Sequence, residues 1–520
     1  MNELTIGWAS RDVSTDKPIN IPGQFHVRIS QGVFDPVTLT ALVVANGSDV
    51  VIFLSADVVV FRGGMLDTIR EKVARLDSSI PVSKIVINAT HTHTGPSTYG
   101  DNPTGTTMGS STPNPDEFSH EGIEIASGNE YREFFAGKAA EAICAAWTGR
   151  APGGIAYGYG YAVVAHSRRV VYFDDLSKRP GAVINSTHGV NGHACMYGNT
   201  NDPNFSHYEA GADHFVNLLY TFDAAGKLTG AIVNVPCPSQ NSEGEWKLSA
   251  SFWNEARAAI RARHGNIFIL PQCAAGGDLS PRTLHYKQAE ARRFALKYGP
   301  KPEPFSELNA RKDIGERIAL AFDEALAWAK KDIKTAAPIA HVVKTVHLDK
   351  RLITEEEAEY ERKQLDKLLK TGFKKDGTPQ ERLHHDSILV ASRNRCRRIL
   401  ARFEEQKAEP KLPMELHAAA IGEVAFASNR FELYMDFMHR IQARSPFTQT
   451  FVIQLAGVPG HDGGTYLATE RGAWGRGYSA SRYCNIVSPQ GGQELVDETV
   501  GLLKDIYGKC SGSERSLQNT

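Results

Sequence analysis

The stretch that decides the fold is Thr90–Pro96, Thr-His-Thr-His-Thr-Gly-Pro, which directly follows the apolar run Lys84–Asn88. The run is rich in β-branched residues and predicts a strand. Side chains two apart on a strand, or on its frayed end, point to the same face, so His91 and His93 can face one cavity. Imidazole is a common zinc ligand, so the pair indicates a metal site, with a packed, hydrogen-bonded pair as the alternative.

Length and composition describe an ordinary globular protein. The chain has 520 residues, of which 41% are hydrophobic and 22% charged, and its net charge of −1 argues against a nucleic-acid partner. Its first residues resemble no secretion signal, and charged or polar residues interrupt the longer apolar stretches. The seven cysteines are scattered without Cys-x-x-Cys spacing. We therefore expect a cytoplasmic protein with free thiols and no membrane span.

Strands and helices alternate along the chain, which predicts an α/β fold of layered mixed β-sheets with flanking helices. We expect strands at 41–44, 50–54, 84–88, 155–164, 169–173, 230–235, 266–270, 415–420, 424–427 and 450–455, and helices at 64–76, 130–147, 248–263 and 431–443. The polar stretch 100–127 is long enough for a lid or a substrate wall.

A change of character marks residues 350–408. Thr354–Glu357, Thr-Glu-Glu-Glu, is a capping-box start for a charged helix, and a second charged helix ends near residue 407. We predict a helical hairpin inserted into a single catalytic domain that covers residues 1–510. The last ten residues, 511–520, are expected to be a disordered tail.

A second chemical signal is Pro271–Pro281, Pro-Gln-Cys-Ala-Ala-Gly-Gly-Asp-Leu-Ser-Pro, which follows a predicted strand. Paired glycines allow backbone torsions closed to other residues, and successive amides of such a turn can hold an anion. Ser280 lies at the exit of the turn. A plain strand-to-helix turn with Asp278 as a capping group is the alternative.

These two stretches together resemble neutral ceramidases and their bacterial relatives. The turn is similar to that family's Gly-Asp-Val-Ser-Pro signature, in which the serine lines the active site. Further segments follow in the family's order, namely Asp12–Thr15, Pro22-Gly23, Arg28, Asp35-Pro36, Ser167–Arg169, Ile421–Ala425 and Tyr466–Glu470. The resemblance covers roughly residues 5 to 508.

The resemblance implies a zinc-dependent amide-cleaving centre. It implies His91, Glu432 and Tyr466 as zinc ligands, with His93 as general base and acid. Arg168 and Tyr478 would stabilise the oxyanion, and Ser280 would line the site.

One position departs from the family. Where relatives have a zinc-binding histidine before Pro-Thr, this chain reads Pro236-Cys237-Pro238. A thiolate is also a zinc ligand, so Cys237 is the predicted fourth ligand. Recruitment of His188, His193 or His461, or loss of the metal, stays open.

The sequence thus predicts a zinc hydrolase that cleaves a carbon–nitrogen amide bond of a small-molecule substrate. Ceramide itself is not expected, because Ser251 stands where relatives carry an acid and the chain has no room for their C-terminal β-sandwich domain. One alternative is an amidase or esterase with Ser280 as nucleophile and a structural metal. Another is a catalytically degenerate binding protein. The oligomeric state is not indicated.

Overall fold

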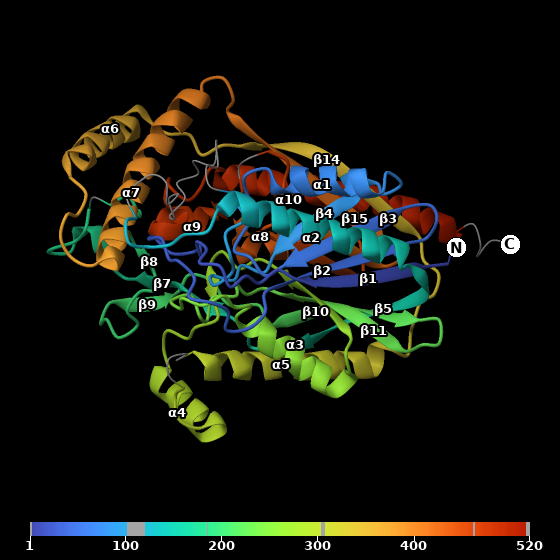
Figure 1. Ribbon diagram of the computed structural model, residues 1–520. Helices are drawn as coiled ribbons and strands as arrows, with labels where there is room; N and C mark the ends of the chain where they lie inside the picture. The colour runs from blue at the N-terminus through green and yellow to red at the C-terminus, as the bar shows by residue number, and fades with distance from the viewer. Residues whose placement is uncertain (1–2, 101–119, 185, 303–306, 461–462, 516–520) are drawn as a thin grey trace.

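Two β-sheets lie face to face between outer layers of helices (Figure 1). The computed structural model describes residues 3–100, 120–184, 186–302, 307–460 and 463–515. The layered α/β architecture predicted from the alternating pattern is confirmed. Most of the predicted loop 100–127 lies outside the described residues.

The larger sheet has eight strands in the order β12-β11-β10-β5-β1-β2-β3-β4. These are β1 (Thr5–Asp12), β2 (Thr38–Ala45), β3 (Val50–Ala56), β4 (Ile85–Ala89), β5 (Ala151–Tyr161), β10 (Phe215–Asp223), β11 (Leu228–Val235) and β12 (Phe268–Cys273). Its pairs are antiparallel except β3 with β4 and β11 with β12. β3 and β4 are buried along their whole length, as expected for strands covered on both faces.

The second sheet has four strands in the order β14-β15-β16-β18. They are β14 (Ile339–Asp349), β15 (Lys411–Ile421), β16 (Val424–Ser428) and β18 (Gln449–Ile453). One apolar cluster joins the two sheets, with Phe53 and Val86 from the larger sheet packed with Phe426 and Phe451 from the smaller. Alternation of apolar side chains along each strand therefore places one face in this central layer and the other against helices.

Helices cover the outer faces. α2 (Gly128–Thr148) packs on β1 and β2 with α1 (Met65–Leu76) beside it, and α5 (Leu308–Ala329) packs on β5 and β10 with α3 (Phe252–His264) beside it. α8 (Met435–Arg444) and α10 (Pro489–Arg515) cover the second sheet. The remaining helical segments are η1 (Val82–Lys84), η3 (Leu176–Lys178), α4 (Lys287–Tyr298), α9 (Glu470–Gly475) and η4 (Tyr478–Ala480).

The predicted helical pair is present and projects at the upper left of the ribbon (Figure 1). It consists of α6 (Glu355–Lys370) and α7 (Pro379–Glu405), and both helices begin with a complete capping box, at Thr354 and Thr378. The expected tail differs, because α10 continues to Arg515. Its earlier turns are anchored by buried residues such as Leu503 and Ile506, and helix propagation from an anchored segment costs little. Residues 516–520 lie outside the described part.

Three small sheets stand at one end of the layers: β6 (His166–Ser167) with β13 (Leu279–Ser280), β17 (Glu432–Leu433) with β19 (Tyr466–Leu467), and β7 (Arg169–Tyr172) between β8 (Ala194–Met196) and β9 (Phe205–Tyr208). The predicted helix at 431–443 is corrected here, because Glu432 lies in β17. Its amide donates to Thr465 O at 2.8 Å, and the helix begins only at Met435, whose amide donates to the Asp278 carboxylate at 3.0 Å.

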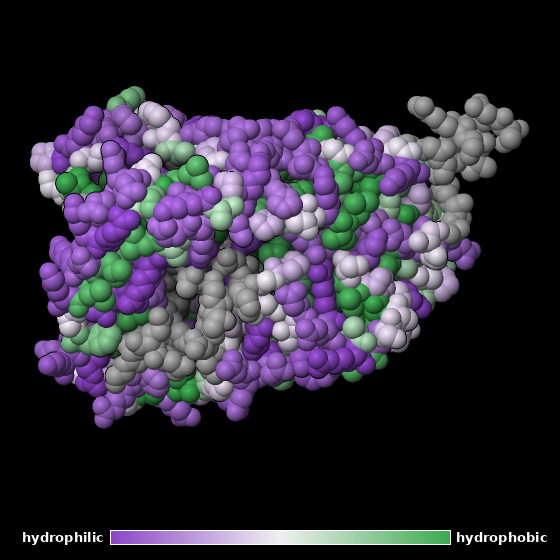
Figure 2. Space-filling view, turned by 90° about the horizontal axis from the view of Figure 1, so that it is seen from above, coloured by the Kyte–Doolittle hydropathy of each residue, from purple (hydrophilic) through white to green (hydrophobic). Residues whose placement is uncertain are grey.

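Hydrophilic atoms dominate the upper face, where hydrophobic atoms form scattered groups (Figure 2). Within the described ranges, none of the helices has both the length and the apolar character required to span a bilayer. All seven cysteines are free thiols.

Candidate functional site

The two histidines predicted from the Thr-His-Thr-His stretch meet just beyond the end of β4. Their Nε2 atoms lie 3.3 Å apart, and both side chains are buried. The two histidine side chains do not converge by strand geometry, because His91 has a φ of 64°. This is the left-handed region of backbone torsions, which non-glycine residues rarely adopt. Such backbone strain at a polar pocket is typical of a functional position.

The segment at Pro22-Gly23 makes room for the second histidine. A Cβ atom on Gly23 would lie 2.7 Å from Cγ of His93, so only glycine fits, and its φ of +108° also favours glycine. Buried Arg28 donates a hydrogen bond to His93 O at 2.5 Å. The N-terminal segment therefore fixes the position of His93.

Glu432 approaches the pair from β17. Its Oε2 lies 3.3 Å from Nε2 of His91, and its strand partner in register is Tyr466. Burial alone would raise the pKa of Glu432, but His91 and Arg168 outweigh that effect and hold this pKa at about 2. Burial also raises the pKa of Tyr466 well above 10, so the site contains a carboxylate next to a protonated phenol.

Arg168 is fully buried beneath these groups. Its Nη2 donates to Gly277 O at 2.8 Å and to the Tyr466 hydroxyl at 3.2 Å, and it lies 3.6 Å from Oε2 of Glu432. The guanidinium thus connects the glycine turn with the β17–β19 pair. It provides a fixed positive charge in a site of low dielectric constant.

Ser280, also predicted from the sequence, lies on β13 beside this arginine. Its Oγ accepts hydrogen bonds from Arg282 N at 3.2 Å and from the Tyr197 hydroxyl at 3.4 Å. Tyr197 also donates to Gln240 Oε1 at 3.2 Å. Ser280 pairs with His166 across the β13–β6 ladder, but the described hydrogen bonds of its Oγ include no histidine or carboxylate that could take its proton.

Two residues that the sequence did not single out complete the surroundings of His93. Gln240 Nε2 lies 3.1 Å from His93 Nε2, and Glu243 Oε2 lies 3.4 Å from Nδ1 of the same ring. Burial lowers the pKa of His93 to about 4. Burial would raise the pKa of Glu243, but His93 and Arg282 hold it at about 2. The only sequence signal for Gln240 was its place three residues after Cys237.

Tyr478 lies on η4 and lines the same pocket as the histidines and Glu432. Its ring packs edge-on against Tyr466 and Phe25, with centroids 5.8 Å and 5.2 Å away. Buried Arg395 of α7 places its guanidinium carbon 5.6 Å from the centre of the Tyr478 ring. The hairpin therefore supports one wall of the site.

Cys237 is buried in the apolar core, and it is not among the residues that line the pocket. Its Sγ lies 3.4 Å from Pro238 O and 3.6 Å from Val164 O. Burial raises the pKa of this thiol well above 9, which keeps it protonated. Zinc ligation by Cys237 therefore stays a prediction, and the thiol must turn and lose its proton to act as a ligand.

The pocket itself holds about 70 Å³. Besides the residues above, its lining includes Val59, Arg62, Tyr99, Leu455 and Gly464. Arg62 donates to Gly464 O at 3.0 Å and is a further pocket residue that the sequence did not reveal.

The proton pattern of the histidines tests whether a cation fits. His91 Nδ1 lies 2.7 Å from Val59 O and must donate to it, which leaves a lone pair on Nε2. If the nearby carboxylate keeps the proton of His93 on Nδ1, the second Nε2 also carries a lone pair. His93 Nε2 then accepts from the Gln240 amide at 3.1 Å, and the lone pair of His91 Nε2 faces it at 3.3 Å with the Glu432 carboxylate beside it.

These separations suit zinc, because two ligands at about 2.0–2.1 Å in tetrahedral geometry are about 3.3 Å apart. The donor chemistry of His91, Glu432 and Tyr466 therefore fits the ion. Histidine, cysteine and acidic side chains alone do not form a complete set of metal ligands. In the part of the chain that the structure describes, no group of three or more of these side chains could hold a metal.

Comparisons with known proteins identify the type of fold. The chain has a layered α/β architecture, and solved structures give its type. It resembles the neutral ceramidase from Pseudomonas aeruginosa with a TM-score of 0.62 and 17% identity, covering 97% of this chain and 75% of that one. It also resembles a ceramidase complexed with C2, with a TM-score of 0.61 and 16% identity, covering 98% and 76%.

The chain therefore has a neutral ceramidase-like fold, as its motifs indicated. No protein-family model and no curated protein sequence matches it.

Proposed function

We propose that this protein is a zinc-dependent hydrolase that cleaves a carbon–nitrogen amide bond in a small molecule. The observation that carries the proposal is the meeting of three potential ligand atoms at one pocket: His91 Nε2 lies 3.3 Å from both His93 Nε2 and Glu432 Oε2. The ceramidase-like fold supports the same reaction class.

His91, Glu432 and Tyr466 would hold the ion, with Cys237 as the predicted fourth ligand. Bound zinc in such a site supplies Lewis-acid polarisation of a carbonyl and lowers the pKa of a water molecule. A substrate other than ceramide is supported by the departures at Cys237 and Ser251.

His93 would move the proton. Its neutral ring can accept a proton from water, and Glu243 beside Nδ1 stabilises the imidazolium that results. The ring can then return the proton to the leaving amine. A general base oriented by a carboxylate in this way contributes roughly 10²–10⁴-fold to a rate.

Arg168 and Tyr478 would stabilise the charge that develops on the carbonyl oxygen. The guanidinium is held by Gly277 O and needs no rearrangement during the reaction. Tyr478 shares the pocket lining with both histidines.

Ser280 as nucleophile is the less favoured mechanism, because its described partners are Tyr197 and Arg282 rather than a base. A burst of product before steady turnover would support it. Retained activity in Ser280→Ala would exclude it.

A binding protein descended from such an enzyme is the second candidate, favoured by the buried position and contacts of the Cys237 thiol. Metal analysis separates the two. The enzyme hypothesis expects about one zinc per chain in wild type and less than a tenth of that in Glu432→Gln, together with hydrolysis of at least one N-acyl compound from a panel. Metal-free wild-type protein that hydrolyses none of the panel would overturn it.

The role of Cys237 needs its own variant. If the thiol is a ligand, Cys237→Ser lowers zinc affinity by at least about tenfold, because thiolate is the stronger ligand. Unchanged zinc affinity would mean that His91, Glu432 and Tyr466 bind the ion without Cys237.

A further inference from the structure

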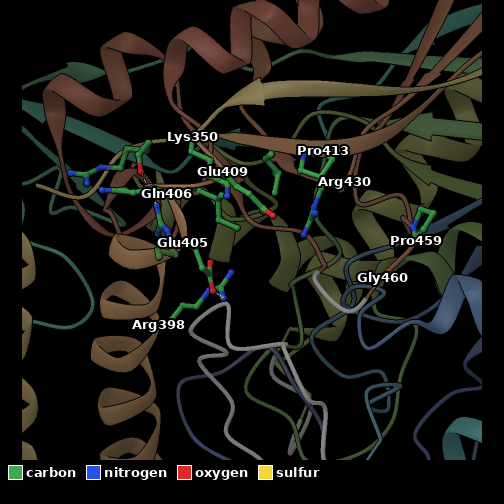
Figure 3. A pocket seen from close by; sticks show the side chains of 13 residues that line it. Lys350, Arg398, Glu405, Gln406, Glu409, Pro413, Arg430, Pro459 and Gly460 are labelled. Atoms are coloured by element: carbon green, nitrogen blue, oxygen red, sulfur yellow. Dashed lines mark hydrogen bonds and ion pairs between the residues drawn. The ribbon is translucent and has the colours of Figure 1, made fainter.

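A second cavity of about 250 Å³ lies where the end of α7 meets the start of β15 (Figure 3). Lys350 comes from the end of β14, Pro413 from β15, and Pro459-Gly460 from the loop after β18. The view shows Arg398 and Glu405 on α7 below these residues and Arg430 opposite them.

The charges that line this cavity are unbalanced. Its basic side chains are Lys350, Arg351, Arg398, Arg402 and Arg430, and its acidic ones are Glu405 and Glu409. Arg351 pairs with Glu357 at 2.6 Å, and Arg398 lies 3.5 Å from Glu405. We call this cavity the basic pocket.

Arg402 carries the argument for an anion. It is only 5% exposed, and its guanidinium donates to three carbonyls, those of Arg482, Arg351 and Asn485, at 2.6 to 3.1 Å. Within the described ranges, no carboxylate lies within 4 Å of Arg402 or Lys350. Carbonyls satisfy the hydrogen bonds of a buried guanidinium but do not cancel its charge.

The surrounding potential agrees with this picture. Burial, together with the like charges of Arg351 and Arg398, lowers the pKa of Arg402 to about 9. Burial is the largest cause, so the positive charge here carries a cost that the carboxylates of Glu357 and Glu405 offset only in part. An anion in the basic pocket would remove that cost.

The basic pocket is separate from the active-site pocket and shares no lining residue with it. The two are linked along the chain, because Arg430 of one and Glu432 of the other flank the buried Phe431. The lining of the basic pocket thus belongs neither to the proposed hydrolysis nor to its ligands.

We propose that the basic pocket binds a small tetrahedral oxyanion, either inorganic phosphate or the phosphate group of a small monoester. Guanidinium groups match phosphate oxygens with paired hydrogen bonds, and several of them favour phosphate over a single carboxylate. A cavity of about 250 Å³ is below the usual size of a drug-like ligand site, which fits a small anion. This inference does not depend on the hydrolase proposal.

The test uses the full-length protein and inorganic phosphate, titrated by calorimetry at constant ionic strength set with sodium chloride. We expect saturable binding with a Kd below about 1 mM and a melting temperature about 2–4 °C higher in 10 mM phosphate, because a ligand that binds the native state stabilises it. No saturable binding up to 10 mM would overturn the proposal.

Variants locate the site. Lys350→Met and Arg398→Met should each weaken phosphate binding by about tenfold, the value of one charge-assisted hydrogen bond. Lys344→Met is the matched control, since Lys344 lies on β14, the strand that Lys350 directly follows, is outside the basic pocket and pairs with Glu498. Unchanged binding in both pocket variants would refute the assignment, even if phosphate binds elsewhere.

Two further ligands identify the anion. The first is a small phosphate monoester, glycerol 2-phosphate. If it binds at least tenfold more tightly than phosphate, the natural ligand is an ester. If it binds equally or more weakly, the natural ligand is the free anion. Acetate that binds more tightly than either would contradict a tetrahedral oxyanion. None of these measurements requires turnover.

Discussion

Two histidine pairs are buried in the described part of the chain, each near a glutamate and an arginine, and they differ in their surroundings. The site pair is His91 and His93. The packed pair is His341 and His417, which meet diagonally across the β14–β15 pair near Glu415. In the packed pair every ring nitrogen has a partner, with His341 Nδ1 on Val50 O at 3.1 Å and His417 Nε2 on Glu415 at 2.9 Å.

The site pair instead borders a cavity, and its two Nε2 atoms face each other. The difference teaches that residue types do not define a site. The adjoining cavity does, because a ligand needs space beside the ring nitrogens that it contacts, and the packed pair does not line the active-site pocket.

The largest expected effect separates the two pairs by activity. His91→Ala should lower kcat/KM by at least about 10³-fold, since it removes a ligand of the proposed catalytic metal. His417→Ala should keep kcat/KM within about threefold, measured per folded molecule on the best substrate of the panel. Equal losses in both variants would show that the site pair has no special role.

A substitution of Arg168 measures how much its positive charge stabilises the other buried charges of the site. Arg168→Met should lower the free energy of unfolding by about 3–5 kcal/mol, because it leaves buried Glu432 without its cation. Urea unfolding measures this change. The double variant Arg168→Met/Glu432→Gln should recover part of the stability, and no recovery would contradict the coupling.

The packed pair should contribute stability alone. His417→Leu is expected to cost about 1–3 kcal/mol, since His341 Nε2 and the Glu415 carboxylate each lose a buried partner. Zinc content, measured by mass spectrometry, should stay equal to that of wild type. A fall in zinc content would mean that the packed pair also binds the ion.

The smallest effect is a pH dependence. Burial lowers the pKa of His341 well below 6.5 and also lowers that of His417. The unfolded chain then binds protons that the folded chain does not, so stability is full above about pH 6.5 and falls as the pH drops below it. Urea midpoints at pH 7 and pH 5 should differ less in His417→Leu than in wild type. An equal difference would exclude the packed pair as a source.

The sequence predicted the layers well, because strand and helix periodicities are local. β3, β4 and α1 lie within two or three residues of their predicted bounds, and the capping box at Thr354 is present. The ceramidase-like fold followed from short motifs at 90–96 and 271–281, although overall identity to solved structures is only 16–17%.

The sequence could not determine how the site is assembled. Glu432 was expected on a helix, and β17 exists only because β19, distant in the chain, pairs with it and places Tyr466 opposite Glu432. Gln240, Glu243 and Arg62 had no pattern that set them apart, and Cys237 had the right place in the order of motifs but lies in the core.

The sequence by itself determined the order of strands and helices and the residue types available for chemistry. Only the tertiary structure decided which histidines border a cavity and which are closed into a hydrogen-bond network, because that depends on contacts between segments hundreds of residues apart. Local propensity acts within a few residues, whereas the position of a lone pair is set by everything that packs around it.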